Sequence, residues 1–437
     1  MLHWAVFALR ALFGIVLLGY TAYAFISVWA ARQWSRDRSA VPDNWTPSVT
    51  ILKPVRGVDA EAWENFSSFC RLDYPNERVQ ILFGALDADD PALELAHRLQ
   101  AEFPHHDIGV VIAPPDAKSG ANRKVCNLLA MLPHAKHDLL VLCDSDMRAR
   151  PDYLRRIVAP FANGGAGLPP ASLETQRHRG ETDEGGKRET GSRGESGGKE
   201  GARESDSKIE NRPVGLVTCP YRGERAQSFA AIVEALGIGA DFIPSTLVSR
   251  AIEGVAFALG STIVLPRHVL DEIGGFEPLL DELADDFRLG NGVYNSGYRV
   301  VLSDYVIDDI LGRERFTAMW SRRLRWSRTL RVCRPAGYAG SFIVYGFAPA
   351  LLFLISMGFS TIGWLAFAAV AAVRITTALT ITLRYTGDRS VLRYLPFLPI
   401  SDLIGVALYI ISFFGRHILW RGERFRLLSG GRLVRED

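Results

Sequence analysis

The stretch LLVLCDSD, residues 139–146, joins a run of apolar residues to two acids that are separated by one serine. Five apolar residues without a charge predict a strand buried on both faces, as in the parallel sheets of α/β proteins. Such a strand delivers Asp144 and Asp146 to the carboxyl edge of the sheet, where ligands of α/β proteins bind. Two carboxylates at this spacing can hold a hard divalent cation against a diphosphate. A solvated turn could contain the same two acids. The buried strand before them is the observation that favours a binding site for a cation and a diphosphate.

Short aliphatic runs of the same kind occur at residues 49–52, 79–86, 108–113 and 214–219. A helix-like segment lies between two of them, at residues 91–103. Strands that alternate with helices predict a mostly parallel α/β sheet. The soluble domain that carries this sheet is expected to extend from residue 47 to residue 334.

Residues 163–212 interrupt this domain with a stretch of different character. From Glu174 to Lys208 the only aliphatic residue is Ala202, and there is no Phe, Tyr or Trp. Such a stretch cannot bury enough apolar surface to offset the entropy of ordering it. We therefore predict a disordered surface insertion, although a docking site for a partner would have the same composition.

The global composition sets further limits on function. The chain has 437 residues and a formal net charge of +2, so no global field draws it to nucleic acid. Its five Cys are scattered without a CxxC pair, which fits a reduced compartment and argues against a cysteine-based zinc site.

Acids also follow the apolar run at 79–86. Asp89 and Asp90 stand before Pro91, where a helix N-cap explains Asp90 as well as a ligand site does. Asn122 and Lys124 lie in a polar loop before an apolar helix at 125–132. An Asn and a Lys at a helix start can bind phosphate or a nucleotide, and a solvated cap is the alternative.

A third group of acids precedes the segment Phe287–Gly290. Glu282, Asp285 and Asp286 have apolar neighbours, so one of these carboxylates could be partly buried and act as a general base. A plain solvated acidic turn explains the same residues.

The segment Arg313–Arg334 contains eight Arg interleaved with apolar and aromatic residues at helical spacing. An interfacial helix on anionic headgroups is one interpretation, and capture of a diphosphate by Arg side chains is another. A nucleic-acid stripe is disfavoured because apolar spans begin immediately afterwards.

Both ends of the chain predict membrane segments. Residues 11–30 form an uncharged run long enough for one crossing, and Arg32, Arg36 and Arg38 follow it. A cleaved signal peptide is the alternative, since Ala22-Tyr23-Ala24 resembles a cleavage site. The positive flank after the run predicts residues 1–31 as an anchor, with the bulk of the chain in the cytoplasm.

The C-terminal region 335–416 has room for two to three spans. Residues 335–373 carry no charge and are expected to break near Met357–Thr361, and a further span at 394–415 contains one acid, Asp402. An acid inside a span should face protein or water rather than lipid. The loop 384–393 and the tail 417–437 are both basic although one crossing separates them, so one segment is expected to be re-entrant or interfacial.

The order of these motifs resembles that of membrane-bound glycosyltransferases of the GT-A type. DxD follows a strand, Asp285-Asp286 comes later, and RRLRW at 322–326 matches their (Q/R)xxRW motif. The closest resemblance is to the ceramide glucosyltransferase family, glycosyltransferase family 21. It rests on LKPVRGVD at 52–59, LDYP at 72–75, DDPA at 89–92 and WRGERFR at 420–426. TCPYRG at 218–223 and RWSRTLR at 325–331 look most like the bacterial hopanoid-biosynthesis branch.

The resemblance implies roles for matching residues. Asp89 or Asp90 would bind the uridine nucleotide, Asp144 and Asp146 the Mg²⁺ or Mn²⁺, and Asp286 would be the base. The family usually has Glu before that last acid and this chain has Asp285, so the choice between Asp285 and Asp286 stays open. The remaining implied residues, on the diphosphate and acceptor side, are Arg322, Arg325 and Trp326.

The implied reaction is a direct displacement by a hexosyltransferase in the inner (cytoplasmic) membrane. A carboxylate takes the proton from an acceptor hydroxyl as it attacks the sugar of a UDP-sugar, which inverts the anomeric centre. The expected acceptor is a membrane lipid: a hopanoid with N-acetylglucosamine as the sugar, or ceramide with glucose. Three rival functions are disfavoured. A processive polysaccharide synthase would need more membrane spans to form a channel, and a non-catalytic sensor of sugar nucleotides would not need the complete set of acids. A metal-dependent phosphodiesterase would normally use a cluster of His ligands.

Overall fold

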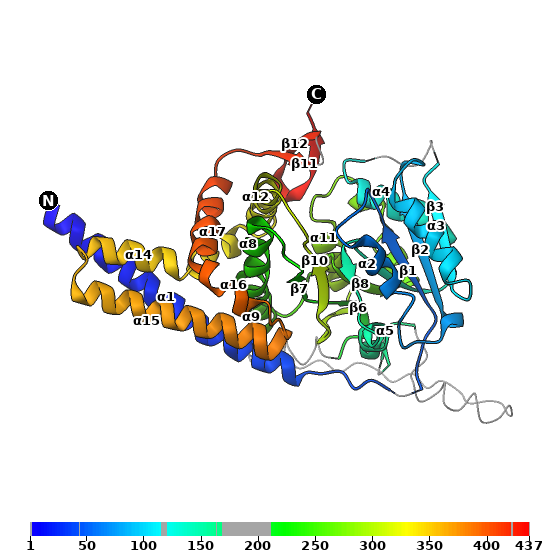
Figure 1. Cartoon of the computed structure of the whole chain (residues 1–437), viewed down its shortest axis with the longest axis horizontal. Coiled ribbons are helices and arrows are strands. Elements are labelled where there is room, and N and C mark those ends of the chain that lie inside the picture. The colour runs from blue at the N-terminus through cyan, green and yellow to red at the C-terminus, as the bar shows by residue number, and fades with distance from the viewer. Residues whose placement is uncertain are drawn as a thin grey trace, which may run out of the picture.

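The computed structural model describes residues 2–42, 44–114, 120–162, 164–167, 211–420 and 423–436. Most of the predicted insertion, residues 168–210, lies outside the described residues. The centre of the α/β domain is a seven-stranded sheet in the order β3-β2-β1-β4-β8-β6-β9 (Figure 1). Its strands are β1 (Val49–Pro54), β2 (Val79–Ala85), β3 (Asp107–Ile112), β4 (Leu139–Cys143), β6 (Val214–Thr218), β8 (Thr262–Pro266) and β9 (Arg299–Leu302).

The sheet is mostly parallel, as the sequence predicts. β1 pairs in parallel with β2 and β4, and only β8 runs antiparallel to its neighbours β4 and β6. The runs predicted at 49–52, 79–86, 108–113, 139–143 and 214–219 are confirmed as strands with small shifts at their ends. β8 and β9 were not predicted from the sequence.

Helices cover both faces of the sheet (Figure 1), which explains why β4 is apolar at every position. Ile51 and Val141 face one core, whereas Leu52 and Leu142 face the other, as the two-residue period of a strand requires. The first core includes residues of α2 (Ala62–Ser68), α3 (Ala92–Glu102) and α5 (Tyr153–Val158). The second includes residues of α4 (Arg123–Met131), α10 (Arg267–Glu272) and α11 (Asp285–Asn295).

A small second sheet lies directly after the DSD sequence. It has the order β5-β10-β7 and consists of β5 (Met147–Arg148), β10 (Ile307–Ile310) and β7 (Tyr221–Glu224). In its register Asp309 pairs with Met147 on one side and with Gly223 on the other. This pairing brings a late part of the chain next to Asp146.

The apolar helices form an arm that extends away from the α/β domain. α1 (Leu2–Arg36), α14 (Phe347–Ser356) and α15 (Thr361–Leu379) lie side by side in Figure 1, with the N-terminus at the tip of the arm. At this tip, Nε of Arg10 donates a hydrogen bond to the carbonyl of Ser356 over 2.8 Å. The break expected near Met357–Thr361 is confirmed, because α14 ends at Ser356 and α15 begins at Thr361.

Four helical segments among the described residues are long and apolar enough to cross a membrane: Phe7–Arg36, Phe229–Glu253, Thr361–Thr386 and Val391–Ser412. A bent pair, Pro335–Val344 and Phe347–Ser356, qualifies only when taken together, with 65° between its halves. The segment Phe229–Glu253, which contains α8 (Phe229–Gly237) and α9 (Ile243–Glu253), was not predicted and is 78% buried inside the protein.

Asp402, the acid in the predicted span at 394–415, faces protein rather than lipid, as the sequence predicts. Asp402, in α17 (Leu398–Ser412), is fully buried and forms an ion pair of 2.6 Å with Arg374 of α15. Arg374 also pairs with Asp241, and the backbone N–H of Phe347 donates to Asp402 over 3.0 Å. Figure 1 shows α17 running across the direction of α1 and α15 rather than alongside them.

The C-terminal tail, predicted only as a basic segment, forms a three-stranded antiparallel sheet of β11 (His417–Trp420), β12 (Glu423–Leu427) and β13 (Leu433–Arg435). The sheet packs on α12 (Phe316–Cys333) and on the loop before α11. Leu433 N–H donates to the carbonyl of Asp281 over 2.7 Å, and Leu283 N–H donates to that of Gly431 over 3.1 Å. The tail sheet therefore stabilises the loop that leads to Asp285. Two short helices, α13 (Pro335–Gly340) and α16 (Val391–Tyr394), complete the helical part.

Candidate active site

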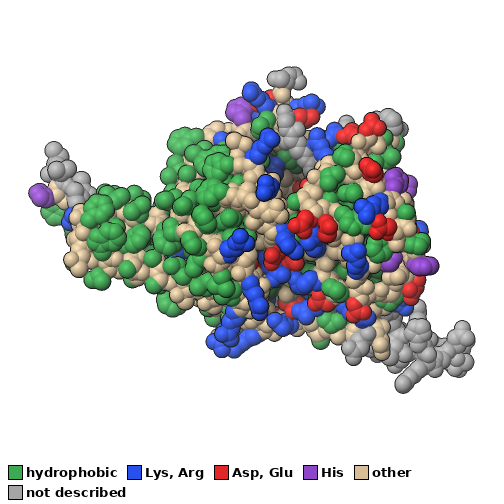
Figure 2. Space-filling model, viewed as in Figure 1, with side chains coloured by type: hydrophobic (Ala, Val, Ile, Leu, Met, Phe, Trp, Pro, Cys, Tyr) green, Lys and Arg blue, Asp and Glu red, His purple; other side chains and the backbone are tan. Residues whose placement is uncertain are grey.

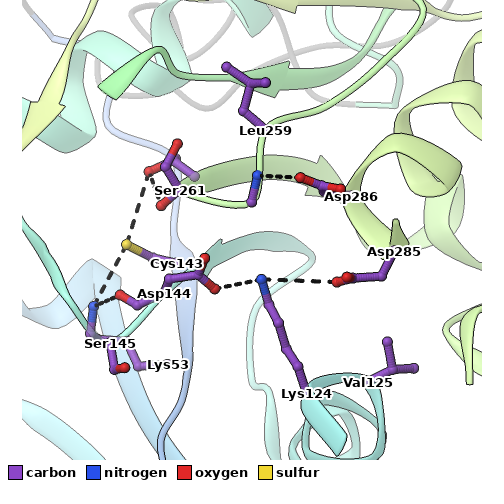
Figure 3. A network of polar contacts seen from close by, with 12 residues as sticks. Lys53, Lys124, Val125, Cys143, Asp144, Ser145, Leu259, Ser261, Asp285 and Asp286 are labelled. Atoms are coloured by element: carbon purple, nitrogen blue, oxygen red, sulfur yellow. Dashed lines mark hydrogen bonds and ion pairs between the residues drawn. The ribbon is translucent and has the colours of Figure 1, made fainter. Parts of the chain in front are cut away.

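Asp144 follows β4 and meets an ammonium group from a different element. Nζ of Lys124, in the first turn of α4, lies 2.5 Å from Oδ1 of Asp144 and 4.0 Å from Oδ2 of Asp285 (Figure 3). Burial alone would lower the pKa of the Lys124 ammonium, but Asp144 and Asp285 raise it above its ordinary value. Lys124 is therefore charged and holds together the two acidic groups that the sequence placed 141 positions apart.

Gly260 marks the point at which three of the predicted site residues converge. A Cβ added to Gly260 would lie 3.3 Å from Oδ2 of Asp144, 3.4 Å from Oδ2 of Asp286 and 3.4 Å from Nζ of Lys124. The missing side chain leaves space between these groups at the carboxyl edge of the sheet. Gly260 was not predicted as a site residue, since a lone glycine in a sequence gives no such signal.

The two adjacent acids at the start of α11 point in different directions (Figure 3). Asp285 faces Lys124, whereas Asp286 turns to the backbone of the segment before β8. Gly260 N–H donates to Oδ2 of Asp286 over 2.9 Å, and Phe287 N–H donates to Oδ1 over 2.7 Å. Two amides thus fix the orientation of the Asp286 carboxylate.

Burial raises the pKa of Asp286 to about 6, and the charge of Asp285 adds to the rise while Lys124 opposes it. Burial also raises the pKa of Asp285, against the lowering effect of Lys124. A carboxylate with a pKa near the working pH is suited to accept a proton in a reaction. Asp286 has that property together with a fixed orientation.

Asp146 provides a carboxylate oxygen for which the described residues offer no partner. Its Oδ1 is buried and has no hydrogen-bond partner there. Burial, followed by the charge of Asp144, raises the pKa of Asp146 to about 7. Within the described residues no three His, Cys, Asp or Glu side chains could hold a metal by themselves. The carboxylates of Asp144 and Asp146 are the type of ligand that Mg²⁺ takes, since this hard cation commonly binds one or two carboxylates and completes its shell with substrate phosphates.

Two charged residues that were not predicted from the sequence lie beside these acids. Lys53 is fully buried, and its Nζ donates to the backbone carbonyl of Asp144 over 2.9 Å. The sequence could have identified Lys53 as a candidate, because it stands in an apolar strand and a buried ammonium needs a partner. Asp309 of β10 is partly buried. Desolvation and the charge of Asp146 raise its pKa well above the ordinary value, while Arg322 lowers it.

Other predicted residues have mainly structural contacts. Asn122 is fully buried, caps α4 by accepting from the N–H groups of Lys124 and Val125, and donates to the carbonyl of Glu282 over 2.9 Å. It therefore joins α4 to the loop before Asp285 and is not the solvated cap of the alternative interpretation. Asp90 accepts from Ala92 N–H, as expected for a cap, and from Gly57 N–H, each over 2.9 Å. Asp89 is exposed in the same loop.

The RRLRW motif lies on α12. Arg322 binds Glu314, with Nη2 donating over 2.7 Å, and its guanidinium lies 5.6 Å from the ring of Trp326. It also lies 3.4 Å from Glu234. Arg325 instead lies over the ring of Trp420 in the tail sheet, at 5.2 Å. Arg322 thus interacts electrostatically with Asp309, whereas Arg325 lies against the tail.

Comparison with known proteins decides the family. The profile of glycosyl transferase family 21 matches residues 11–181 and 204–433. The chain belongs to glycosyltransferase family 21. The match confirms the resemblance to family 21 and the hexosyltransferase class. The mixed α/β sheet agrees with the predicted GT-A type fold.

The relatives of this family 21 chain include named enzymes. It is 20% identical to ceramide glucosyltransferase 1 of Caenorhabditis elegans over 454 residues, which covers 98% of the chain and 82% of that protein. It is 34% identical to a ceramide glucosyltransferase of Candida albicans over 119 residues, but this match spans only 22% of that protein and 25% of the chain.

One solved structure with a similar arrangement is the mannosyltransferase PcManGT from Pyrobaculum calidifontis, in complex with GDP-Man and Mn²⁺. The two share 17% identity at a TM-score of 0.49, over 93% of this chain and 99% of the other.

Proposed function

We propose that this protein is a membrane-bound inverting glycosyltransferase that moves a sugar from a UDP-sugar to the hydroxyl group of a membrane lipid. The observation that carries the proposal is the convergence of Asp144, Lys124 and Asp286 around Gly260. This convergence lies at the carboxyl edge of an α/β sheet, where such sheets bind their ligands. The membership of family 21 supports the same reaction class.

The diphosphate of the sugar donor would bind between the DxD acids and Lys124. Asp144 and Asp146 would hold Mg²⁺ or Mn²⁺, and the cation would neutralise charge on the leaving diphosphate. Lys124 offers a second positive charge at the same place, 2.5 Å from Asp144. Arg322 supports this side of the site from α12, because its charge acts on Asp309, which in turn interacts with Asp146. A role for Asp89 or Asp90 in binding the uridine stays a prediction.

Asp286 is proposed as the base. The amides of Gly260 and Phe287 hold its carboxylate in place, and it lies close enough to the Gly260 space to meet an acceptor hydroxyl there. Removing the proton while the oxygen attacks the anomeric carbon gives one displacement, so an α-linked donor yields a β-glycoside. Asp285, which faces Lys124, is proposed to orient that lysine.

The acceptor is proposed to be a lipid because the apolar arm is anchored close to the site: Ala30, Ala31 and Trp34 at the end of α1 belong to the same core as Leu259, the residue before Gly260. A lipid with a hydroxyl at headgroup level can approach the base while its apolar body stays among the helices, and a soluble acceptor needs no such arm. The names of the relatives favour ceramide with UDP-glucose. A hopanoid with UDP-N-acetylglucosamine is the second candidate, supported by the local matches at 218–223 and 325–331.

The proposed membrane arrangement uses the arm seen in Figure 1. α1 and the α14–α15 hairpin would insert in the bilayer, and α17 would lie along its surface, since it runs across the arm. This places the loop 384–393 and the tail on the same side, which accounts for their shared basic charge. Arg32, Arg36 and Arg38 at the end of α1 favour the cytoplasmic side of the inner membrane for the catalytic domain.

The experiment is a matrix of two donors and two acceptors with the purified full chain in bilayer nanodiscs. Radiolabelled UDP-glucose or UDP-N-acetylglucosamine is supplied with either ceramide or a polyol hopanoid, and organic-phase label is separated by thin-layer chromatography. We expect glucosylceramide, in reactions that EDTA abolishes and Mn²⁺ or Mg²⁺ restores. Label only on the hopanoid would reverse the order of the candidates, and full activity in EDTA would contradict the proposed role of the two acids.

A further inference from the structure

One face of α12 carries two arginines that the proposed transfer reaction does not use, Arg328 and Arg331, next to Arg325 of the RRLRW motif. Arg325, Arg328 and Arg331 are spaced i, i+3 and i+6, so they share a face of the helix. This face meets the C-terminal end of α17 and the tail sheet. Arg325 lies over Trp420, whereas Arg328 and Arg331 reach the backbone after α17.

Arg328 and Arg331 bind backbone carbonyl groups, and the Arg331 guanidinium also lies 5.9 Å from the ring centre of Phe413. Arg328 donates to the carbonyl of His417 and, over 2.9 Å, to that of Phe414; Arg331 donates to that of Gly415 over 3.2 Å. Neither guanidinium forms an ion pair with a carboxylate of the described residues. Within the same residues, the Nε atoms of both side chains are buried without a hydrogen-bond partner. Both side chains are only partly buried, and neither has a carboxylate partner among the described residues, so their guanidinium groups can take an anionic partner through charge-assisted hydrogen bonds.

A groove beside these arginines is large enough for a headgroup. It measures about 530 Å³ and lies between α12 and the tail sheet, where Arg325, Arg328, His417 and Arg424 line it. Glu436 is the one acid in this lining, and it already contacts His417 at 2.7 Å and Arg426 at 3.8 Å. The groove therefore has an excess of positive charge.

The surroundings of the groove are those of a bilayer surface. Phe414 and Leu419, next to the carbonyls that Arg328 binds, expose 69% and 56% of their surface, and Trp326 and Leu330 of α12 are also exposed. Figure 2 shows Lys and Arg side chains along the junction between the apolar arm and the catalytic domain. Basic groups with exposed aromatic and aliphatic side chains are typical of segments that lie on anionic membranes.

We propose that the groove between α12 and the tail sheet binds the phosphate of an anionic phospholipid, such as phosphatidylglycerol. Arg328 lines the groove and Arg331 lies three residues further along the same face of α12, at the edge of the groove; these two are proposed as the principal phosphate ligands. Arg424 lies on the tail-sheet side of the groove, and Phe414 and Leu419 would contact the acyl region. The bound lipid would hold α12, and with it Arg322, at a fixed height over the bilayer. This site is distinct from the space around Gly260, and the inference does not depend on which sugar or acceptor the enzyme uses.

The experiments distinguish a bound phospholipid from two alternatives. A free phosphate or the diphosphate of a nucleotide would suit the same charges, but neither would explain the exposed apolar side chains beside them. The arginines could also serve only to cap the C-terminal end of α17 through its carbonyls. In that case the charge would matter less than the number and geometry of the donors.

The test is native mass spectrometry of the purified full chain in a non-ionic detergent. Phosphatidylglycerol and phosphatidylcholine with the same acyl chains compete for the protein, and the ratio of retained lipids gives the preference. Each arginine near an anionic surface contributes on the order of a 5-fold gain, so the variant Arg328→Gln/Arg331→Gln should lose about 30-fold of the preference. The control Arg313→Gln/Arg315→Gln removes the same charge from exposed positions before α12 and should keep the preference.

Two further measurements separate the alternatives. The variant Arg328→Lys/Arg331→Lys keeps the charge but not the two-pronged contacts, and it should retain the preference to within about 3-fold; an equal loss in the Lys and Gln variants would show a structural cap instead. Millimolar inorganic phosphate or UDP should not displace the lipid, and displacement by either would overturn the lipid assignment.

The last measurement uses the wild-type chain, so it does not depend on the folding of a variant. Photoactivatable phosphatidylglycerol should cross-link to α12, to the end of α17 or to the tail sheet. Cross-links confined to the arm would contradict the proposal.

Discussion

Nζ of Lys124 lies 2.5 Å from a carboxylate oxygen of Asp144, and the same ammonium lies 4.0 Å from Asp285. The first contact joins α4 to the DxD sequence, and the second joins it to the acids of α11. One lysine therefore fixes the relative position of the metal side and the base side of the proposed site. Its substitution should disturb both binding and catalysis.

We predict that Lys124→Met raises the KM for the UDP-sugar by about 10- to 100-fold, the scale of a hydrogen bond to a charged group. The kcat should fall as well, because Asp285 loses its counter-charge. Initial rates at varied UDP-sugar concentration measure both quantities. Lys136→Met is the matched control, since Lys136 pairs with Asp107 on the surface and should leave the kinetics unchanged. An unchanged KM in Lys124→Met would remove this lysine from the sugar-donor site.

Asp286→Asn should keep the shape of the side chain but remove the proton acceptor. We expect binding of UDP-sugar to survive while kcat falls about 10²- to 10⁴-fold, the range for loss of a general base. Calorimetric binding of UDP and a product assay separate the two effects. If Asp285→Asn is inactive and Asp286→Asn retains activity, the base is the other carboxylate.

The pH dependence of kcat follows from the raised pKa of Asp286, which is about 6. The base must be deprotonated, so the rate should be full above that pKa and fall as the pH drops through about 6. Each further unit of acidity should lower the rate about ten-fold. Measurements at saturating Mg²⁺ in wild type and in Asp286→Asn test the assignment. If the residual kcat of Asp286→Asn also fell at the same pH, a group other than Asp286 would be responsible for the pH dependence.

The buried pair of Arg374 and Asp402 should matter for stability rather than for chemistry. Arg374→Met leaves Asp241 and Asp402 without their shared cation, and breaking a buried pair in this way costs about 3–5 kcal/mol. The double variant Arg374→Met/Asp402→Leu should recover part of the loss, since it removes one of the two carboxylates left without their cation, while Asp241 still has Arg323 at 3.9 Å. Apparent melting temperatures in nanodiscs measure the effect, with Arg384→Met as an exposed control on the same helical segment. A double variant that melts below Arg374→Met would refute this account.

The sequence predicted those parts of the fold that depend on local pattern. The uncharged run before Asp144 identified a buried strand, and the uncharged runs at both ends identified the helices of the arm. It also identified Asp144, Lys124 and Asp286 as candidates, because polar residues after strands or at helix starts meet at one edge of an α/β sheet. Their convergence at Gly260 required the folded structure.

The features that the sequence did not predict depend on contacts between distant segments. Asp309 enters the site through the pairing of β10 with β5, and nothing near it in the sequence marks it. Arg374 ended the uncharged run at 335–373, whereas in the structure α15 continues through it because Asp241 and Asp402 supply its counter-charge. The tail reads as a basic segment, yet Leu427 and Leu433 are buried in a small sheet against α12.

The central claim is that the acids around Gly260 transfer a sugar to a lipid in one displacement. The most direct test uses the wild-type chain in nanodiscs with UDP-α-[¹⁴C]glucose and ceramide, and it determines by NMR the anomeric configuration of the lipid-phase product. The account predicts a β-glucoside that Asp286→Asn forms at least about 100-fold more slowly. An α-glucoside, or label found only in water-soluble products, would contradict it.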